Sequence, residues 1–433
     1  MLNLVNGQLF RLRDKIFLSF PFLQRIAIFF AVFGPATITA MADNDASGVA
    51  TYSIAGAKLG YPILFVLLVI TPLLAITQEM GVRLTVITKK GLGDLIRENF
   101  GVRTSFLIFT SLLFANLATI TVDLTAIKTA SSLLNLPTFP FILVMLITIV
   151  FFVIKGGYKL TQNIMLISSL FYLTYVFSAF RAKPDWNLAL SNLFVPHSIQ
   201  FNGEYLRNFL FIGLGVIGTT ITPWGQFFIS SFAFDKKIAA SRIKFAQIET
   251  YVGAFLTNFF SFFMVVATAA TLFVNGIPLA TGEQAALAIK PFAGEMAGVL
   301  FAVGILNAGF MGVVIVSLST AYAFSEFFGL SGSLDRSFTQ NRGFYIIFLF
   351  QLAVAAIISL FPQASLFKLA VTAQVINAIM LPLVFKYLIH FTSSKNIMGN
   401  FVNSDFKRRF AKIATVIIIA ASIAAILSAI LGG

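Results

Sequence analysis

Two carboxylates and an amide stand together in a stretch where most other residues are apolar or small. Asp43, Asn44 and Asp45 lie in the middle of TAMADNDASGVAT, residues 39–51. A carboxylate in an apolar segment is expensive without a partner, and a divalent cation is a natural partner for it. These residue types therefore indicate cation binding, provided that the segment around them is buried.

A second group of polar and helix-breaking residues interrupts the apolar run LGVIGTTITPWGQFF, residues 214–228. Thr219, Thr220 and Thr222 come just before Pro223, and Gly225 follows it. Proline removes a backbone donor and disfavours helix at the residue before it. The sequence therefore predicts that this helix breaks at Thr222.

The composition places both interruptions in a polytopic membrane protein. Of the 433 residues, 58% are hydrophobic and only 11% are charged, whereas soluble domains are roughly 25% charged. The absence of cysteine excludes disulfides, thiolate metal sites and thiol catalysis. The sequence contains neither a phosphate-binding loop of the GxxxxGK[ST] type nor an HExxH motif, so we expect no enzyme and no bound cofactor.

The elements that must position these residues are membrane-spanning helices, each near or above the roughly 20 residues needed to cross a bilayer. We expect an all-α protein with about 11 spans, preceded by a cytoplasmic segment at 1–24. The expected spans are 25–57, 61–88, 104–127, 138–154, 160–181, 206–233, 243–274, 295–328, 343–361, 366–391 and 410–431.

The positions of the basic residues predict the orientation of these spans. With the N-terminus in the cytoplasm, alternate loops should be basic, because Lys and Arg gather on the cytoplasmic side. The net charge of +14 is then explained by loops facing an inner (plasma) membrane surface, without a nucleic-acid partner. An odd number of spans puts the C-terminus outside. The basic loops contain Lys89, Lys90, Arg97 and Arg103; Lys155 and Lys159; Lys236, Lys237, Arg242 and Lys244; Arg336 and Arg342; and Lys395, Lys407, Arg408, Arg409 and Lys412.

Residues 42–48 could form either an external hairpin loop or an unwound point within one helix. A span that began at residue 49 would run for about 40 residues to 88, which is too long for one crossing. A turn at Gly60-Tyr61-Pro62 gives two spans of ordinary length and favours the broken helix. Paired breaks in spans one and six are typical of transporters built from inverted repeats, here 25–181 and 206–391 with an added span at 410–431.

Several segments, in the right order, resemble the NRAMP family of divalent-metal transporters. They include GPATITAMADNDASGVATYSIAGAKLGY (34–61), TVITKKGLGDLIRENFG (85–101), ATITVDLTAIKTA (118–130), GTTITPWGQFF (218–228), LFAVGILNAG (300–309) and AQVINAIMLPL (373–383). The resemblance implies the LeuT-type fold, with helices one and six discontinuous. It also implies uptake of a divalent metal ion through a lipid bilayer, without an obligatory protein partner.

Aligned on AGAKLGY, the family's ligand positions can be placed on this sequence. In the first helix, the family's aspartate falls on Asp45 and its asparagine on Gly48. In the sixth helix, the family's motif Ala-Thr-x-Met-Pro-His falls on residues 219–224, which puts its methionine on Thr222. A soft thioether is thus replaced by a hydroxyl, and the remaining donors are all oxygen, which suits Mg²⁺, Mn²⁺ and Ca²⁺. Small residues at two ligand positions also suggest room for water, which favours Mg²⁺. The pattern resembles the NRAMP-related magnesium transporters.

The resemblance implies one set of metal ligands and leaves other residues open. Asp43 could hold metal-bound water or simply line the site. Asn307, Gln374 and Asn377 could touch a hydrated ion, although hydrogen bonding between helices is the more ordinary role. The implied metal site consists of Asp45, Thr222, the backbone oxygens of Ala42 and Thr219, Gly48 and Asp43.

Residues that could carry protons are scarce along the expected route. Asp123 matches the first acid of the family's proton path, but the next acidic position is Ala126. The histidine positions of helix six are Trp224 and Ile229, and the two histidines of the chain fall in or beside loops. We therefore expect a Mg²⁺ and Mn²⁺ uniporter. The alternatives are a proton-coupled Mn²⁺ or Fe²⁺ transporter, a membrane sensor that does not conduct and, more remotely, an organic-solute symporter.

Overall fold

The computed structural model describes residues 34–197, 199, 202–330, 332–361 and 365–431. These residues form a bundle of helices, and no strand occurs among them. Residues 1–24, and the first part of the span expected at 25–57, lie outside the described residues. The α-helices are α3 (Pro35–Ala42), α4 (Ala46–Leu59), α5 (Leu64–Thr88), α6 (Leu92–Leu133), α7 (Thr138–Ser168), α8 (Leu173–Arg181), α9 (Trp186–Phe194), α10 (Gly203–Thr220), α11 (Pro223–Asp235), α12 (Ile243–Thr268), α13 (Gly282–Ala286), α14 (Lys290–Ala293), α15 (Ala297–Phe328), α16 (Arg342–Leu360), α17 (Leu366–Thr392), α18 (Lys395–Met398) and α19 (Asp405–Leu431).

Within the described part of the chain, nine helical stretches are long and apolar enough to cross a membrane. They account for the second to the eleventh expected spans, because one stretch, Thr138–Arg181, holds both 138–154 and 160–181. The first expected span is the broken pair α3 and α4. The polytopic all-α architecture predicted from composition is therefore confirmed.

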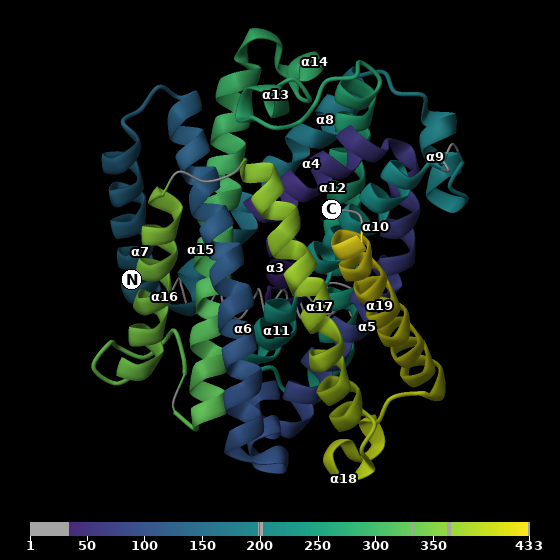
Figure 1. Cartoon of the computed structure of the whole chain (residues 1–433). Helices are drawn as coiled ribbons and strands as arrows, with labels where there is room; N and C mark the ends of the chain where they lie inside the picture. The colour runs from purple at the N-terminus through teal and green to yellow at the C-terminus, as the bar shows by residue number, and fades with distance from the viewer. Residues whose placement is uncertain (1–33, 198, 200–201, 331, 362–364, 432–433) are drawn as a thin grey trace, which may run out of the picture.

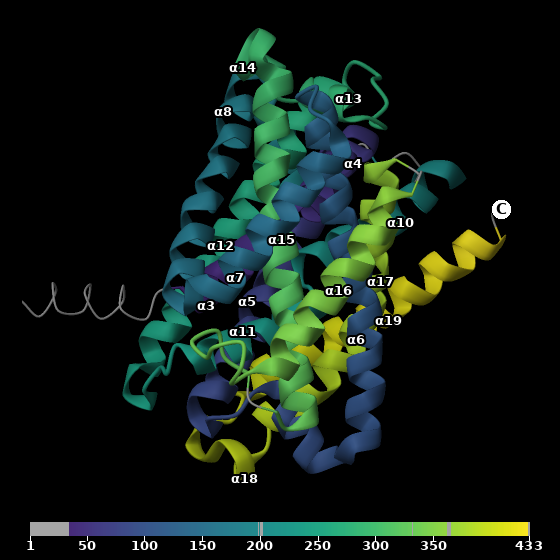
Figure 2. The ribbon, with the colours of Figure 1, turned by 90° about the vertical axis from the view of Figure 1, so that its left-hand side faces the viewer.

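The expected loop at 155–159 is shorter than predicted, because only Gly157 is nonhelical between two helical segments. Gly157 has a φ of 65°, a left-handed conformation that bends the chain between two crossings. The Tyr158 amide donates to Asp335 Oδ1 at 3.1 Å, in the loop between α15 and α16. The helix then continues through α8, which ends beside α14 at the opposite end of the molecule (Figure 2).

Two other expected loops contain helices. Residues 92–100 form the first part of α6, and a kink at Gly101, whose φ is 80°, separates them from the rest of that helix. The segment 182–205 contains α9, which Asp185 caps by accepting a hydrogen bond from the Leu188 amide at 2.9 Å. Neither helix was recognisable by hydropathy alone, because one is polar and the other is short.

Both predicted helix breaks are present, and both lie inside the bundle. Residues 43–45 separate α3 from α4, and residues 221–222 separate α10 from α11. Every one of these five residues is buried. Figure 1 shows α3 and α11 in the lower half of the view and α4 and α10 in the upper half. The breaks therefore lie near mid-depth, which excludes the external hairpin.

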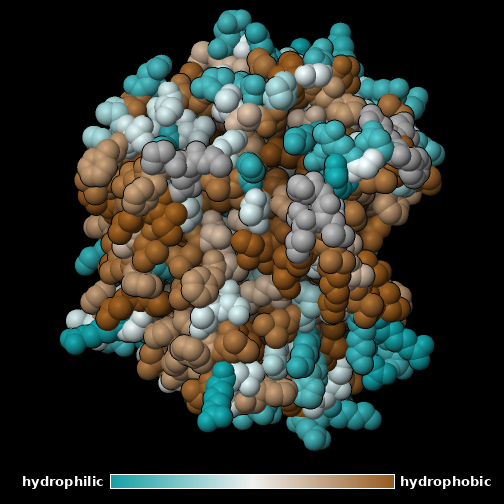
Figure 3. Space-filling model, in the orientation of Figure 1, coloured by the Kyte–Doolittle hydropathy of each residue, from teal (hydrophilic) through white to brown (hydrophobic). Residues whose placement is uncertain are grey.

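The outer surface has the pattern expected for a protein in a bilayer. On the face shown in Figure 3, apolar residues dominate the middle and hydrophilic residues gather at the upper and lower margins. The basic loops meet at the lower end. Lys89 Nζ donates to the Ile238 carbonyl at 2.8 Å, and the Leu334 amide donates to Asp235 Oδ2 at 3.1 Å. The loops that the sequence predicts to be basic thus lie together at one end of the molecule.

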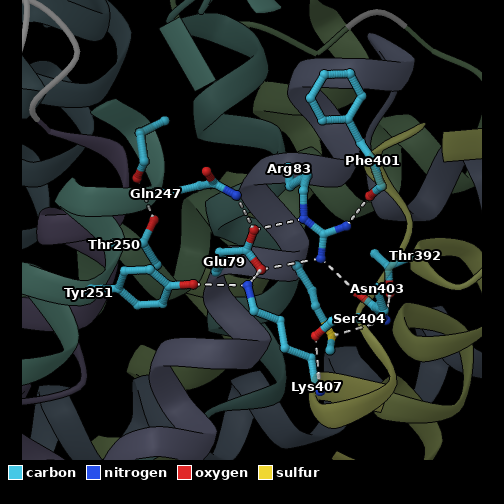
Figure 4. Close-up of polar contacts among 12 residues, drawn as sticks. Glu79, Arg83, Gln247, Thr250, Tyr251, Thr392, Phe401, Asn403, Ser404 and Lys407 are labelled. Carbon is cyan, nitrogen blue, oxygen red and sulfur yellow. Dashed lines mark hydrogen bonds and ion pairs between the residues drawn. The ribbon is translucent and has the colours of Figure 1, made fainter. Parts of the chain in front are cut away.

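A buried carboxylate, Glu79 of α5, organises polar contacts near this lower end (Figure 4). Arg83 donates to it through Nε at 2.7 Å and Nη2 at 3.2 Å, and Lys407 Nζ lies 2.9 Å from Oε2. Gln247 of α12 donates to Oε1 at 2.7 Å, and Arg83 also donates to Asn403 Oδ1 at 2.6 Å. The network ties α5, α12 and the segment leading into α19 together.

Replacing Glu79 should destabilise the fold strongly. The Arg83 side chain is 5% exposed, and removing the partner of a buried charge costs about 3–5 kcal/mol. Glu79→Ala should therefore lower the midpoint of thermal unfolding in detergent by several degrees or more. The control is Glu98→Ala, since Glu98 pairs with Lys90 where the two side chains are 40% and 46% exposed. Such a pair contributes at most about 1 kcal/mol. Equal shifts in the two variants would contradict a structural role for the network.

Candidate functional site

The first break ends at Asp45, which is the N-cap residue of α4. Asp45 precedes α4, and its Oδ1 accepts hydrogen bonds from the Gly48 amide and the Ser47 hydroxyl, both at 2.7 Å. A carboxylate at this position satisfies backbone donors that have no partner within the helix and faces the positive end of the helix dipole. The predicted charged ligand is thus fixed in place by the start of α4.

The second break is built in the same way. Thr222 precedes Pro223, the first residue of α11, and its Oγ1 accepts from the Gly225 amide at 3.0 Å. The same hydroxyl donates to Asp43 Oδ1 at 3.1 Å. Thr222 therefore caps its own helix and contacts the other break, so the two sequence motifs meet in space.

The two breaks also approach each other closely along the backbone. Thr219 Oγ1 donates to the carbonyl of Asp43 at 3.3 Å. A Cβ atom at Gly48 would overlap that same carbonyl and would lie 2.9 Å from Thr219 Oγ1. The expectation that Gly48 leaves room for water is therefore wrong in this conformation. The space that a larger side chain would need is filled by the neighbouring break.

A third carboxylate, Asp123 of α6, lies on the other side of Asp45. The Ser47 amide donates to Asp123 Oδ1 at 3.2 Å. Both carboxylates face Gly312 of α15, where an added carbon would contact Asp123 Oδ2 and the Cβ of Asp45. Asp43 belongs to the same break as Asp45, two residues earlier. The three carboxyl side chains thus form one buried group.

Two oxygens of this group lack partners. Asp43 Oδ2 and Asp123 Oδ2 are buried and accept no hydrogen bond from any described residue. Leaving a charged acceptor buried and unsatisfied costs more than the 1–3 kcal/mol that is typical of neutral groups. A cation, with or without its waters, would supply the partner that these two oxygens lack.

The two residues whose backbone oxygens the family resemblance implies as ligands, Ala42 and Thr219, lie at the same place. The Ala42 carbonyl ends α3 and accepts from the Asp45 amide at 3.0 Å, which leaves its second lone pair available. Thr219 lies in the last turn of α10, beside Asp43. The structure therefore brings together all six predicted site residues.

The three amides left open by the sequence have different surroundings. Gln374 donates from Nε2 to Ser47 Oγ at 2.5 Å and so reaches the first break indirectly. Asn377 donates to Gln374 Oε1 at 2.8 Å and to Thr119 Oγ1 at 3.1 Å. Asn307 donates to the Ser168 carbonyl at 3.0 Å, which joins α15 to α7. Only Gln374 belongs to the shell around the carboxylates.

Sequence reasoning missed the residues that hold the breaks from outside. Asn44 donates to Thr257 Oγ1 at 2.9 Å and accepts from Ser261 Oγ at 2.9 Å, both on α12. The Tyr172 hydroxyl donates to the Asn44 carbonyl at 2.5 Å. Asn44 was visible as a polar residue, but nothing in the sequence identified α12 as its partner.

Glu249, also on α12, caps the start of the broken helix. Its carboxylate accepts from the backbone amides of Gly34, Ala36 and Thr37 at 3.1, 3.3 and 2.6 Å. This contact joins residues more than 200 positions apart in the sequence. α12 therefore holds both the beginning and the end of α3.

The arrangement suits a hard cation held by a mixed oxygen shell. In the described part of the chain, no group of three or more His, Cys, Asp and Glu side chains is placed to hold a metal ion alone. Hydroxyls, carbonyls and water would therefore complete the coordination. The two histidines do not contribute, because the His197 amide bonds to Asn192 and His390 packs against Phe100 and Phe391.

Comparisons with known proteins agree with this architecture. The family model described as "Nramp: Natural resistance-associated macrophage protein-like" matches residues 36–428. The chain is 25% identical over 420 residues to the divalent metal cation transporter MntH of Levilactobacillus brevis, covering 93% of this chain and 89% of that protein. These relatives are transporters, which confirms the expectation that the chain is not an enzyme.

Solved structures show the same fold. The manganese transporter of Eremococcus coleocola, in complex with an aromatic bis-isothiourea substituted compound, superposes with a TM-score of 0.77 at 18% identity. It covers 92% of this chain, and 86% of that chain is matched. MhsT, in complex with L-phenylalanine, gives a TM-score of 0.60 at 14% identity, with 91% and 98% covered. Since the family model spans residues 36–428, most of the sequence, this chain belongs to the Nramp family.

Proposed function

We propose that this protein carries divalent metal cations, Mg²⁺ and Mn²⁺, across the plasma membrane into the cell as partly hydrated ions. The observation that carries the proposal is the pair of buried carboxylate oxygens without partners, Asp43 Oδ2 and Asp123 Oδ2, beside two helix breaks. Irregular backbone at membrane depth is tolerated where it lines a cavity or a binding site. The names of the relatives, a divalent metal cation transporter and a manganese transporter, support the same substrate class.

The donor chemistry supports Mg²⁺ and Mn²⁺ over softer metals. Thr222 supplies a hydroxyl oxygen, and the other predicted donors are carboxylate and carbonyl oxygens. Hard oxygen donors suit Mg²⁺, Mn²⁺ and Ca²⁺, whereas thiolate and thioether donors select softer ions. Because a side chain at position 48 would meet the Asp43 carbonyl, space at Gly48 does not support Mg²⁺, and the choice of Mg²⁺ and Mn²⁺ over softer metals rests on the donor type alone.

We further propose uniport, with the potential across the membrane as the driving force. A divalent cation that crosses roughly 100 mV gains about 4–5 kcal/mol. In the first turns of α11, where the family has histidines, this chain has Trp224 and Ile229, which cannot carry protons. Proton-coupled Mn²⁺ transport is the second candidate, and Asp123, buried beside Asp45, is the observation that favours it.

The proposal includes an orientation and a division into repeats. The basic loops gather at the lower end of the molecule, which we assign to the cytoplasm together with the N-terminus. The C-terminus is then external. The two breaks assign helices to repeats at 25–181 and 206–391, with α19 outside both.

Transport into liposomes distinguishes the two coupling modes. Purified protein reconstituted with a K⁺ and valinomycin potential should take up Mn²⁺, and excess Mg²⁺ should compete. An internal pH dye should report no acidification that scales with metal flux. Acidification in proportion to flux would replace uniport by the proton-coupled alternative. No metal uptake at all would refute the proposed function.

Asp45→Asn should abolish uptake while keeping the fold. Asparagine is as good a helix cap as aspartate, so α4 should still begin at Ala46. The variant loses the charge that holds the cation, and we expect Mn²⁺ uptake to fall to less than about a tenth. Asp185→Asn is the matched control, because it is the same change at the cap of α9, away from the site. Near-normal uptake in Asp45→Asn would remove this residue from the site.

Thr222→Met should change the order of metal preference. The thioether is a poor Mg²⁺ ligand, so excess Mg²⁺ should inhibit Mn²⁺ uptake less than in the wild type, while Cd²⁺ should gain. The change also removes the cap of α11, which costs about 1 kcal/mol. Thr222→Val removes the same hydroxyl without adding sulfur and separates the two effects. If both variants keep the competition profile of the wild type, the side chain at position 222 does not set selectivity.

A further inference from the structure

One fully buried amide near the site has no hydrogen bonds from its side chain. Gln226 of α11 is 1% exposed, and neither Nε2 nor Oε1 has a partner among the described residues. Buried side-chain polar atoms nearly always have at least one partner, and an exception calls for a physical reason such as water or an ion. An amide with both ends unsatisfied is therefore a sign of something that occupies the space beside it.

The position of Gln226 relates it to the two breaks. It is the fourth residue after Thr222, so it lies one helical turn further along α11 on nearly the same side. The intervening Gly225 faces the first break, because an added Cβ there would lie 3.6 Å from Asp43 Oδ1. α11 then runs on toward the basic end of the molecule. Gln226 thus lies just beyond the carboxylates on the cytoplasmic side of the proposed orientation.

An apolar layer lies one turn further along α11. Ile229 and Ala233 of α11 pack with residues of α3, α5 and α12 in a cluster that is separate from the main core. The Cγ2 atom of Ile229 lies against Gly81 of α5, where an added Cβ would be 3.0 Å away. The buried members of this apolar layer are Ala36, Val82, Val86, Ile229, Ala233, Ile238, Ile243 and Ala246. Gln226 therefore lies between the carboxylates and the apolar layer along α11.

The facing helix carries a similar feature at this level. Gly81 also faces the Gln226 carbonyl, 3.8 Å from the position of an added Cβ. Gln78 lies three residues earlier on α5, and its buried Oε1 has no partner within the described residues. Helices α5 and α11 pack together, and each carries a buried amide oxygen that has no hydrogen-bond partner among the described residues.

We propose that Gln226 forms a second station for the hydrated cation, between the carboxylate site and the apolar layer. The inference rests on the proposed function and adds a positioning residue to it. Water bound to a metal ion directs its hydrogens outward, and an amide oxygen accepts them without adding charge. A neutral station of this kind would hold the ion more weakly than the carboxylates, as conduction requires of a site that an ion must leave.

A static structural role predicts different behaviour. If ordered water alone satisfied Gln226, the amide would be part of the fold, and its replacement would leave the transport rate unchanged. If the amide serves the moving ion, the empty protein carries an unsatisfied group. An apolar residue of similar size should then be at least as stable, because replacing an unsatisfied polar group by an apolar one removes a penalty.

The test is Gln226→Leu in reconstituted protein, with Mg²⁺ and Mn²⁺ as the probes. We expect the maximal uptake rate to fall about tenfold, with more loss for Mg²⁺ because it holds its water more tightly. The KM should stay within about twofold, because the carboxylates still bind the ion. The midpoint of thermal unfolding in detergent should stay equal or rise.

Gln351→Leu is the matched control. Gln351 of α16 is an equally buried amide whose Oε1 also lacks a partner among the described residues, but whose Nε2 donates to the Ser317 carbonyl at 2.6 Å. Its replacement should lower stability and leave uptake per folded molecule unchanged. Wild-type uptake together with an unchanged rate in Gln226→Leu would overturn the second station and leave the proposed function intact. A fall in unfolding temperature with no change in rate would also overturn it, whereas absent wild-type uptake would refute the proposed function itself.

Discussion

A helix that breaks at membrane depth leaves polar groups that water cannot satisfy, and the rest of this structure depends on how those groups are paired. The two breaks solve the problem together. Asp45 and Thr222 cap the helices that follow them, and Thr222 and Thr219 donate across to Asp43. These contacts leave one carboxylate oxygen of Asp43 and one of Asp123 without a hydrogen-bond partner. Buried polar atoms without partners also occur further along α11, at Trp224 Nε1 and at both ends of the Gln226 amide. The unpaired oxygens of Asp43 and Asp123 are the carboxylate members of this group, and they lie where a cation would be bound.

The sequence predicted the breaks because they depend on local chemistry. Carboxylates in an apolar run and a proline after three threonines are visible without a structure, and so are the span lengths that favour a broken helix over a hairpin at 42–48. Partners distant along the chain could not be predicted in this way. Glu249 reaches the start of α3, and Asn44 reaches Thr257, each across more than 200 residues. Asp123 was recognised only as a position in a family pattern, although its contact with Ser47 makes it part of the same buried group.

The corrections have a common physical cause. Residue type suggested an open space at Gly48, but packing decides whether a missing side chain leaves room, and here the backbone of Asp43 fills it. Charge suggested a loop around Lys155 and Lys159, but a single left-handed glycine at 157 turns the chain while the flanking residues stay helical. The amphipathic and short helices at 92–100 and 186–194 escaped for a similar reason, since hydropathy measures burial in lipid rather than helix formation. Composition therefore specifies which segments cross the membrane more reliably than it specifies how they join.

The same breaks that present ligands also divide each helix into parts that can move separately. α3 and α11 lie toward the basic end of the molecule, and each is joined to its continuation only through nonhelical residues. Glu249 holds the start of α3 to α12, and the apolar layer joins α3, α5, α11 and α12 below the site. An ion bound between Asp43, Asp45 and Thr222 would bridge the end of α3 and the start of α11. Its binding energy would therefore depend on the relative position of these two helices. In a transporter that alternates its access, binding and movement must be coupled through differential contacts. Here both depend on the few residues that interrupt two helices, which explains why the carboxylates stand at the breaks and not within an intact helix.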